Sequence, residues 1–237
     1  MGGWAAALAA LSTLLATAAG APATPSVSLS ASFVLKTIDP QGSDTVSGDL
    51  SFIPGGEVCV AVKTPTVQEM RLSLHELVIY YPTRDLAFVA HLEPTHPPPM
   101  LDALAAGMVD PGSTLPRESK LLERKAADGT LTTRWRVVAG TTELGEMRTV
   151  ESRAGALSIE LRDKAGQPQR RFTFADRVRV GAHSIPRSIV ADYFAAGAQK
   201  REERWSLGDV APADPRRPAQ IGCARLGPRT KIQALAW

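Results

Sequence analysis

The chain has 237 residues, with 27 Lys and Arg against 24 Asp and Glu, and a formal net charge of +3. Charges of both signs are mixed along the chain and only 5% of the residues are aromatic, so no basic cluster interleaved with aromatic side chains exists to bind nucleic acid. We therefore expect no nucleic-acid partner.

The N-terminus has the composition of a secretory signal. Residues 4–19, WAAALAALSTLLATAA, are small or apolar and uncharged, and cleavage could follow Ala16-Thr17-Ala18 or Ala18-Ala19-Gly20. The alternative is a membrane anchor, but the run is shorter than the roughly 20 residues that span a bilayer. We expect a signal peptide over residues 1–20 and a single mature domain over 21–237, located in an oxidising compartment, most simply the periplasm.

The first half of the mature chain alternates between apolar and polar residues with period two. In the first run Phe33 and Leu35 share one face, while Val34 and Lys36 share the other. Short alternating runs separated by turn residues predict an antiparallel meander with one buried and one solvated face. The expected strands are 33–38, 46–53, 57–63, 67–74, 77–81 and 86–92.

The pattern changes after Pro97-Pro98-Pro99. Met100, Leu101, Leu104 and Met108 recur at helical spacing, which predicts a short helix. This helix could be a connector packed on the sheet, a lid over its apolar face, or both.

Strands resume as hairpins in the second half. Asp128-Gly129 between two alternating runs is a strong hairpin signal. Residues 185–194 carry Pro186 near their start and could form a strand or a short helix. The tail from about residue 211, rich in Pro, Arg and Gly, is expected to be irregular. The other expected strands are 120–125, 131–138, 148–153, 157–162, 170–175 and 201–207.

The residues that could perform chemistry form no recognisable catalytic or metal-binding motif. His75, His91, His96 and His183 are scattered, without metal-ligand spacing. The acidic residues Glu143, Glu146 and Glu151 alternate with Arg148 and Arg153, which indicates a solvated strand face with cross-strand ion pairs. We therefore expect no enzyme, no catalytic residue, no metal ion and no cofactor.

The two cysteines, Cys59 and Cys223, leave two alternatives open. They could form one disulfide that ties the C-terminal tail to an early strand, or remain separate thiols, with Cys59 acting as a small buried hydrophobic residue. A bridge would close a loop of about 165 residues and could contribute about 4–5 kcal/mol through chain entropy.

Several short motifs recur in the first half of the chain: Gly48-Asp49-Leu50, then Pro54, Pro65, and Leu77 and Tyr80 before Pro82. Their order and spacing resemble the periplasmic outer-membrane lipoprotein carrier family, the LolA and LolB proteins. A weaker similarity runs from Ile185-Pro186 to Glu203–Val210. The resemblance covers residues 27–95 well and 120–212 loosely.

This resemblance implies a mainly β fold with a few helices: a strongly curved, incomplete antiparallel β-barrel whose open face the helices cover. It also implies a carrier that shields acyl chains of a lipoprotein or another lipid in an apolar cavity. Inner-membrane donor and outer-membrane acceptor proteins would be its partners, and the carrier itself would be a monomer. One departure concerns the lid: where the family has Arg before the Pro of the second turn, this chain has Ile53, which cannot donate a hydrogen bond.

The candidate cavity residues are the apolar residues on one face of each early strand, together with those of the expected helix. They are Phe33, Leu35, Leu50, Phe52, Val58, Val60, Met70, Leu72, Leu74, Ile79, Phe88, Leu101, Leu104 and Met108.

An alternative function is a non-catalytic cell-envelope binding or assembly module, whose core is filled by its own side chains.

Overall fold

The computed structural model describes residues 28–52, 57–73, 76–91, 115–181, 183–213, 223–224 and 226–234. These residues are almost entirely β, apart from one 3-10 turn at Pro82–Arg84. The strands are β1 (Leu29–Asp39), β2 (Gly42–Phe52), β3 (Val58–Thr64), β4 (Gln68–Leu72), β5 (Glu76–Tyr81), β6 (Leu86–His91), β7 (Lys120–Ala127), β8 (Thr130–Ala139), β9 (Thr142–Ser152), β10 (Gly155–Arg162), β11 (Pro168–Val180), β12 (His183–Ala195), β13 (Ala198–Pro212) and β14 (Lys231–Ala234).

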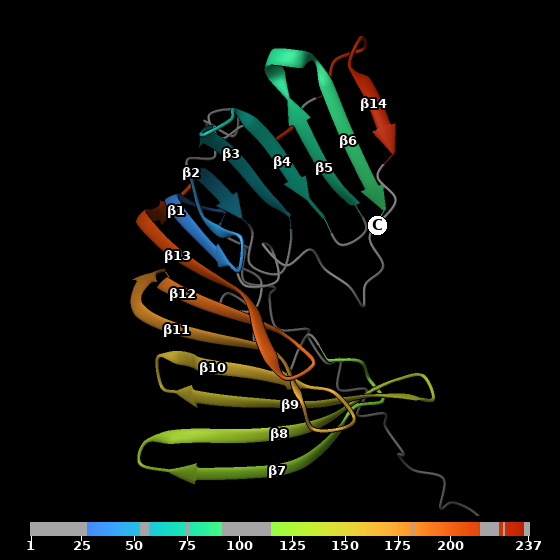
Figure 1. Ribbon diagram of the computed structural model, residues 1–237. Coiled ribbons are helices and arrows are strands. Elements are labelled where there is room, and N and C mark those ends of the chain that lie inside the picture. The colour runs from blue at the N-terminus through green and yellow to red at the C-terminus, as the bar shows by residue number, and fades with distance from the viewer. Residues whose placement is uncertain are drawn as a thin grey trace, which may run out of the picture.

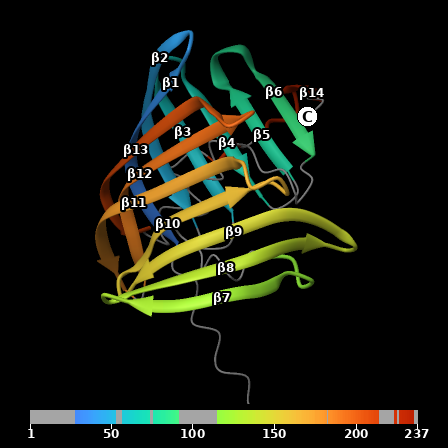
Figure 2. The same cartoon turned by 60° about the horizontal axis from the view of Figure 1, so that its bottom comes forward.

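All fourteen strands belong to one sheet in the order β14-β6-β5-β4-β3-β2-β1-β13-β12-β11-β10-β9-β8-β7. The chain starts at the centre with β1, runs outward to β6, resumes at the opposite edge with β7 and returns to the centre with β13 (Figures 1 and 2). Every pairing is antiparallel except that of β14 with β6. The predicted meander is confirmed, and it has two halves that meet at β1 and β13.

Local turn chemistry explains where the hairpins fold. The Asp39 carboxylate accepts hydrogen bonds from the backbone N–H groups of Gln41 and Gly42 at 2.8 and 3.1 Å, which closes the β1–β2 turn. Asp128 and Gly129 both have positive φ, 50° and 74°, as a type I′ hairpin requires, so the predicted β7–β8 hairpin is confirmed.

Residues 185–194 form part of strand β12 rather than a helix. Pro186 pairs with Arg177 of β11, but the pairing of β12 with β13 begins only at Ser188. Proline has no backbone N–H to donate. It is therefore tolerated at this position, where β12 has a paired strand on one side and not on the other.

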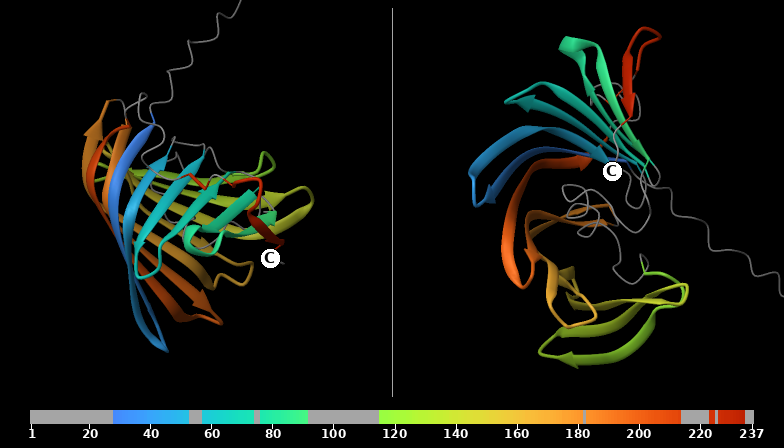
Figure 3. Two further views of the ribbon diagram at one scale, coloured as in Figure 1. Left: turned by 90° about the horizontal axis from the view of Figure 1, so that it is seen from above. Right: turned by 45° about the vertical axis from the view of Figure 1, so that its right-hand side comes forward.

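The sheet is strongly curved, and its two halves form wings that curl toward one another (Figure 3). Register shifts interrupt several pairings, among them β1–β13 near Ser30 and β2–β3 near Gly48. Such bulges bend a strand and increase its twist. At Gly48 and Gly145 a Cβ atom would lie 2.0 Å from the carbonyl oxygen of a neighbouring strand, so only glycine permits this close approach.

The core lies on one face of the sheet, which we call the inner face because its buried residues from both wings form one cluster. Trp205 of β13 contacts Phe33 of β1 at this centre, with ring centroids 5.6 Å apart. The opposite, outer face includes solvated side chains such as Val34, which is 47% exposed, but Cys59, Val78 and Ala87 on this face are buried.

The C-terminal segment fastens one edge of the sheet. Cys223 forms a disulfide with Cys59 of β3, which settles the open alternative in favour of the bridge. Further along, the backbone N–H of Lys231 donates to the carbonyl of Asp85 at 3.0 Å, and β14 pairs in parallel with β6. The expectation of a wholly irregular tail from about residue 211 was therefore wrong, because residues 211–212 complete β13 and 231–234 form β14.

The expectation that helices cover the open face finds no support in the described residues, which hold no helix beyond the turn at Pro82–Arg84. Nor does this described part contain a helix with the length and hydrophobicity of a membrane-spanning segment. The expected helix over 100–108 and the expected signal peptide over 1–20 lie outside the described residues.

Candidate functional site

The predicted cavity residues of the early strands share the inner face. Cross-strand register places Leu50 opposite Val60, and Val60 opposite Met70. Met70 in turn pairs with Ile79, and Ile79 with Phe88, so one apolar row runs from β2 to β6. The described members of the set are Phe33, Leu35, Leu50, Phe52, Val58, Val60, Met70, Leu72, Ile79 and Phe88. Leu74, Leu101, Leu104 and Met108 lie outside the described residues.

Burial along this row is graded. The members on β1 to β3 and Met70 on β4 are buried, whereas Leu72, Ile79 and Phe88 toward the β6 edge are half-buried. The row is therefore apolar throughout, and its accessible part lies toward the β6 edge, where each CH₂ group withdrawn from water is worth about 0.8 kcal/mol.

The apolar row continues across the second wing, which the sequence prediction did not include. Trp205 and Leu207 of β13 lie opposite Leu35 and Phe33. The same alternation that selected Phe33 and Leu35 is present in these later strands and could have identified them. The members added on the second wing are Met147, Ile159, Phe172, Phe174, Ile185, Ile189, Trp205 and Leu207, and those added on the first wing are Leu29, Ala31, Val62 and Leu77.

One ionisable side chain interrupts this apolar face. Glu203 is fully buried, and its Oε1 atom lies 2.5 Å from Arg201 Nη2. The Trp205 indole N–H and the Tyr193 hydroxyl donate to its Oε2 atom, each at 3.4 Å. Burial raises the pKa of the Glu203 carboxyl, although the ion pair with Arg201 and the hydrogen bonds act in the opposite direction.

The outer face of β8 to β13 carries the predicted cross-strand ion pairs. Arg134 bridges Glu123 and Glu146 at 3.2 and 3.0 Å, and Arg136 pairs with Glu143 at 3.7 Å. These pairs are solvated and worth at most about 1 kcal/mol each. Glu151 does not belong to this face, because its register partner Leu131 points inward and its Oε1 accepts a hydrogen bond from Thr149 at 3.0 Å.

Glu160 illustrates the same surface chemistry with a partly covered carboxylate. Burial raises its pKa, but Arg162 at 2.5 Å and Arg171 at 3.0 Å donate to it and lower the pKa overall. Such a carboxylate is held in its charged form, which suits an ion pair and not a proton donor.

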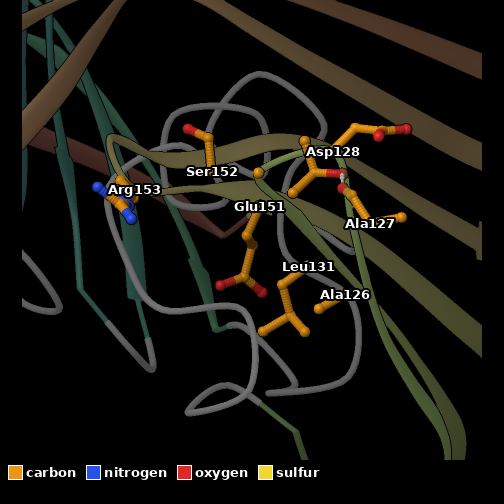
Figure 4. A pocket seen from close by; sticks show the side chains of 9 residues that line it. Ala126, Ala127, Asp128, Leu131, Glu151, Ser152 and Arg153 are labelled. Carbon is orange, nitrogen blue, oxygen red and sulfur yellow. Dashed lines mark hydrogen bonds between the residues drawn. The ribbon is translucent and has the colours of Figure 1, made fainter.

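Two pockets open on the β7–β10 wing. One, of about 520 Å³, lies at the tips of the β7–β8 and β9–β10 hairpins, where the Glu151 carboxylate points toward Leu131 (Figure 4). The other, of about 580 Å³, lies on the outer face among charged side chains that include Arg134, Glu146 and Arg148. Neither pocket includes a predicted cavity residue.

The carboxylate of Glu57 lies beside the disulfide, with Oε1 3.5 Å from Cys59 Sγ and 3.3 Å from Cys223 Sγ. The three ligand-type atoms lie within 4.8 Å of one another. Because the disulfide occupies both sulfurs, they are not thiolates and do not form a metal-binding set in this state.

No family model matches the chain, and no curated protein sequence matches it. Solved structures of similar fold include the three described below. A DUF1329 family protein from Desulfovibrio piger has a TM-score of 0.62 at 10% identity, over 86% of this chain and 93% of the other. A LolA superfamily protein from Nitrosomonas europaea has a TM-score of 0.56 at 11% identity, over 80% and 88%.

The third is an outer membrane lipoprotein-sorting protein domain from Vibrio parahaemolyticus, with a TM-score of 0.53 at 10% identity, over 82% of this chain and 90% of the other. At these identities the likeness shows the fold alone. The resemblance read from the early motifs is confirmed at that level: this chain has a LolA-like fold.

Proposed function

We propose that this protein is a non-catalytic carrier of the cell envelope that shields acyl chains of a lipoprotein or another lipid on the apolar inner face of its curved sheet. The observation that carries this proposal is the apolar inner face shared by both wings, which includes Phe88 on β6, Val60 on β3 and Trp205 on β13. A long hydrocarbon chain needs a continuous apolar surface of this kind and no covalent chemistry.

Two further observations support a carrier that works in the periplasm. The Cys59–Cys223 disulfide suits an oxidising compartment. One structural neighbour is described as an outer membrane lipoprotein-sorting protein domain, which makes a lipoprotein a reasonable cargo. Transfer would then run from an inner-membrane donor to an outer-membrane acceptor, and release would require a partner with a better apolar surface.

The proposal is tested by native mass spectrometry of the mature protein purified from a periplasmic extract, followed by solvent extraction of any bound molecule. A co-purifying acylated species is expected and would name the cargo class. A clean apo mass, together with no binding of a hydrophobic fluorescent probe, would reject the carrier function.

A matched pair of variants locates the binding surface. Ile79→Gln alters a half-buried position on the inner face, and Val89→Gln alters a half-buried position on the outer face of the adjacent strand. We expect the first to weaken probe binding at least threefold and the second to leave it within twofold. Equal effects of the two variants would mean that the inner face is not the binding surface.

A second candidate is a cell-envelope assembly module, and the open edge strand β7 favours it. Every residue of β7 is exposed, including Leu121 at 50% and Leu122 at 39%. An edge strand such as β7, which pairs with β8 on one side only, can accept a strand from a partner protein on its other side. The apo mass and the lack of probe binding that would reject the carrier would leave this candidate.

A further inference from the structure

A row of polar side chains crosses the inner face where three neighbouring strands approach their hairpin turns. Arg170 of β11 lies opposite Tyr193 of β12, and Tyr193 lies opposite Arg201 of β13. Directly paired residues of antiparallel strands point to the same side, so all three belong to the inner face. With neighbouring strands about 4.8 Å apart, the two arginine Cα atoms are about 10 Å apart.

Buried Glu203 positions this row. Its carboxylate holds Arg201 through the 2.5 Å ion pair and accepts the Tyr193 hydroxyl at 3.4 Å. Leaving a buried carboxylate without a cation would cost several kcal/mol, so Arg201 is fixed against Glu203. The Tyr193 ring is held separately, by an edge contact with Phe172 at a centroid distance of 6.4 Å.

Arg201 keeps capacity for a second partner. Its side chain is 39% exposed, and its buried Nε–H group has no hydrogen-bond acceptor among the described residues. A buried donor without an acceptor is costly, and an incoming anion would remove that cost. Arg170 brings a second guanidinium group to the same row.

We propose that Arg170, Tyr193 and Arg201 bind the phosphate head group of an acylated lipid whose hydrocarbon chains lie on the apolar inner face. This inference rests on the proposed carrier function and adds the chemical class of the cargo. Guanidinium groups bind phosphate through paired N–H donors. A phosphate group presents several oxygens, so two arginines on either side of Tyr193 can contact it together, whereas a carboxylate fits one guanidinium.

The test measures binding of two short-chain lipids to the full mature protein by quenching of tryptophan fluorescence. Dioctanoylphosphatidic acid carries the phosphate, and dioctanoylglycerol has the same acyl chains without it. We expect Arg201→Gln to weaken binding of the phosphatidic acid at least tenfold and to leave binding of the diacylglycerol within twofold.

Two further variants keep the result interpretable. Arg204→Gln removes a 59% exposed arginine from the outer face of the same strand and should change neither affinity. The double variant R201Q/E203Q removes the cation without stranding the buried carboxylate, and we expect it to show the same selective tenfold loss.

The possible failures are distinguishable. If the wild type binds neither lipid, the carrier function itself is refuted, and this inference with it. If the wild type, R201Q and the double variant all bind both lipids equally, the carrier function stands and the phosphate assignment is overturned. Octanoate that competes as well as dioctanoylphosphatidic acid, and loses affinity equally in R201Q, would also overturn the assignment to phosphate.

Discussion

Replacing Gly48 by alanine should destabilise the protein strongly, because the backbone of β3 leaves no room for a Cβ atom at this position of β2. A Cβ atom at this position would lie 2.0 Å from the carbonyl oxygen of Ala61 and 2.9 Å from its carbonyl carbon. Neither contact can be relieved by a side-chain rotation, since both atoms are backbone. Strand β3 would have to move by at least 1 Å to restore the 3.0 Å that real Cβ contacts require.

The cost of that movement can be bounded. Overpacking a well-packed core costs about 1–3 kcal/mol, and each ladder hydrogen bond that the shift breaks adds about 1 kcal/mol. We therefore expect Gly48→Ala to lower the free energy of unfolding by about 3 kcal/mol. With a urea m-value of about 2 kcal/mol/M, the unfolding midpoint would fall by about 1.5 M.

The assay is equilibrium unfolding in urea, followed by tryptophan fluorescence, to which Trp205 contributes from its buried position at the sheet centre. Gly227→Ala is the matched control, because its Cβ would meet only Thr230 Oγ1 at an ordinary 3.6 Å. The control should stay within about 0.5 kcal/mol of the wild type. A midpoint for Gly48→Ala lowered by less than about 0.3 M would refute the reasoning from the close approach of β2 and β3.

Three further predictions concern the bridge, the buried carboxylate and the two faces. Replacing both Cys59 and Cys223 by alanine should lower the free energy of unfolding by about 5 kcal/mol, less any residual order in the unfolded chain, because the bridge closes a loop with 164 residues of separation. Reducing the disulfide of the wild type should lower its urea midpoint by a similar amount. An unchanged midpoint in both experiments would contradict this prediction. Burial raises the folded-state pKa of Glu203, so unfolding releases a proton, and the free energy of unfolding should fall as the pH rises from about 4.3 through that raised value. Urea unfolding between pH 4 and 7 should show a shallower decline of this free energy for Glu203→Gln than for the wild type. Parallel curves would mean that the Glu203 carboxyl does not cause the decline. Leu35→Ala on the inner face should cost about 2–5 kcal/mol and Val34→Ala on the outer face about 0.5 kcal/mol or less, and similar losses for these neighbours would contradict the assignment of faces.

Much of the sheet follows from the sequence because burial has period two. Phe33 and Leu35 are buried while Val34 and Lys36 are exposed, as the alternation predicts. Asp128-Gly129 likewise predicts its hairpin, since the turn needs two residues with positive φ. The register between strands that are distant in sequence has no local sequence signal. The pairing of β1 with β13 therefore could not be predicted from the sequence and was seen only in the structure.

The missed features are those without a local pattern. β14 has only four residues, all exposed, and is positioned by the disulfide and by Asp85. The polar row was missed for a different reason, although a signal was present. Arg201 and Glu203 are in phase with Trp205 and Leu207, and charged residues in the apolar phase of a strand indicate a buried polar site.

The seam between β1 and β13 has a consequence for how the chain is synthesised and exported. All other antiparallel pairs join strands that are consecutive in sequence, whereas Leu29 pairs with Pro212. During N-to-C synthesis β1 emerges first. The edge of β1 that will pair with β13 stays without a partner until β13 has been synthesised. Two locally folded meanders would then close in a late, long-range step, which is the slow class of contact in folding. Because the backbone N–H of Ala213 donates to the carbonyl of Ser28 at 2.7 Å, a short linker could join these two points. A circular permutant joined in this way and opened between β6 and β7 would lack residues 214–237, with Cys223 and β14, but it would make β13 and β1 consecutive and turn this long-range contact into a local hairpin.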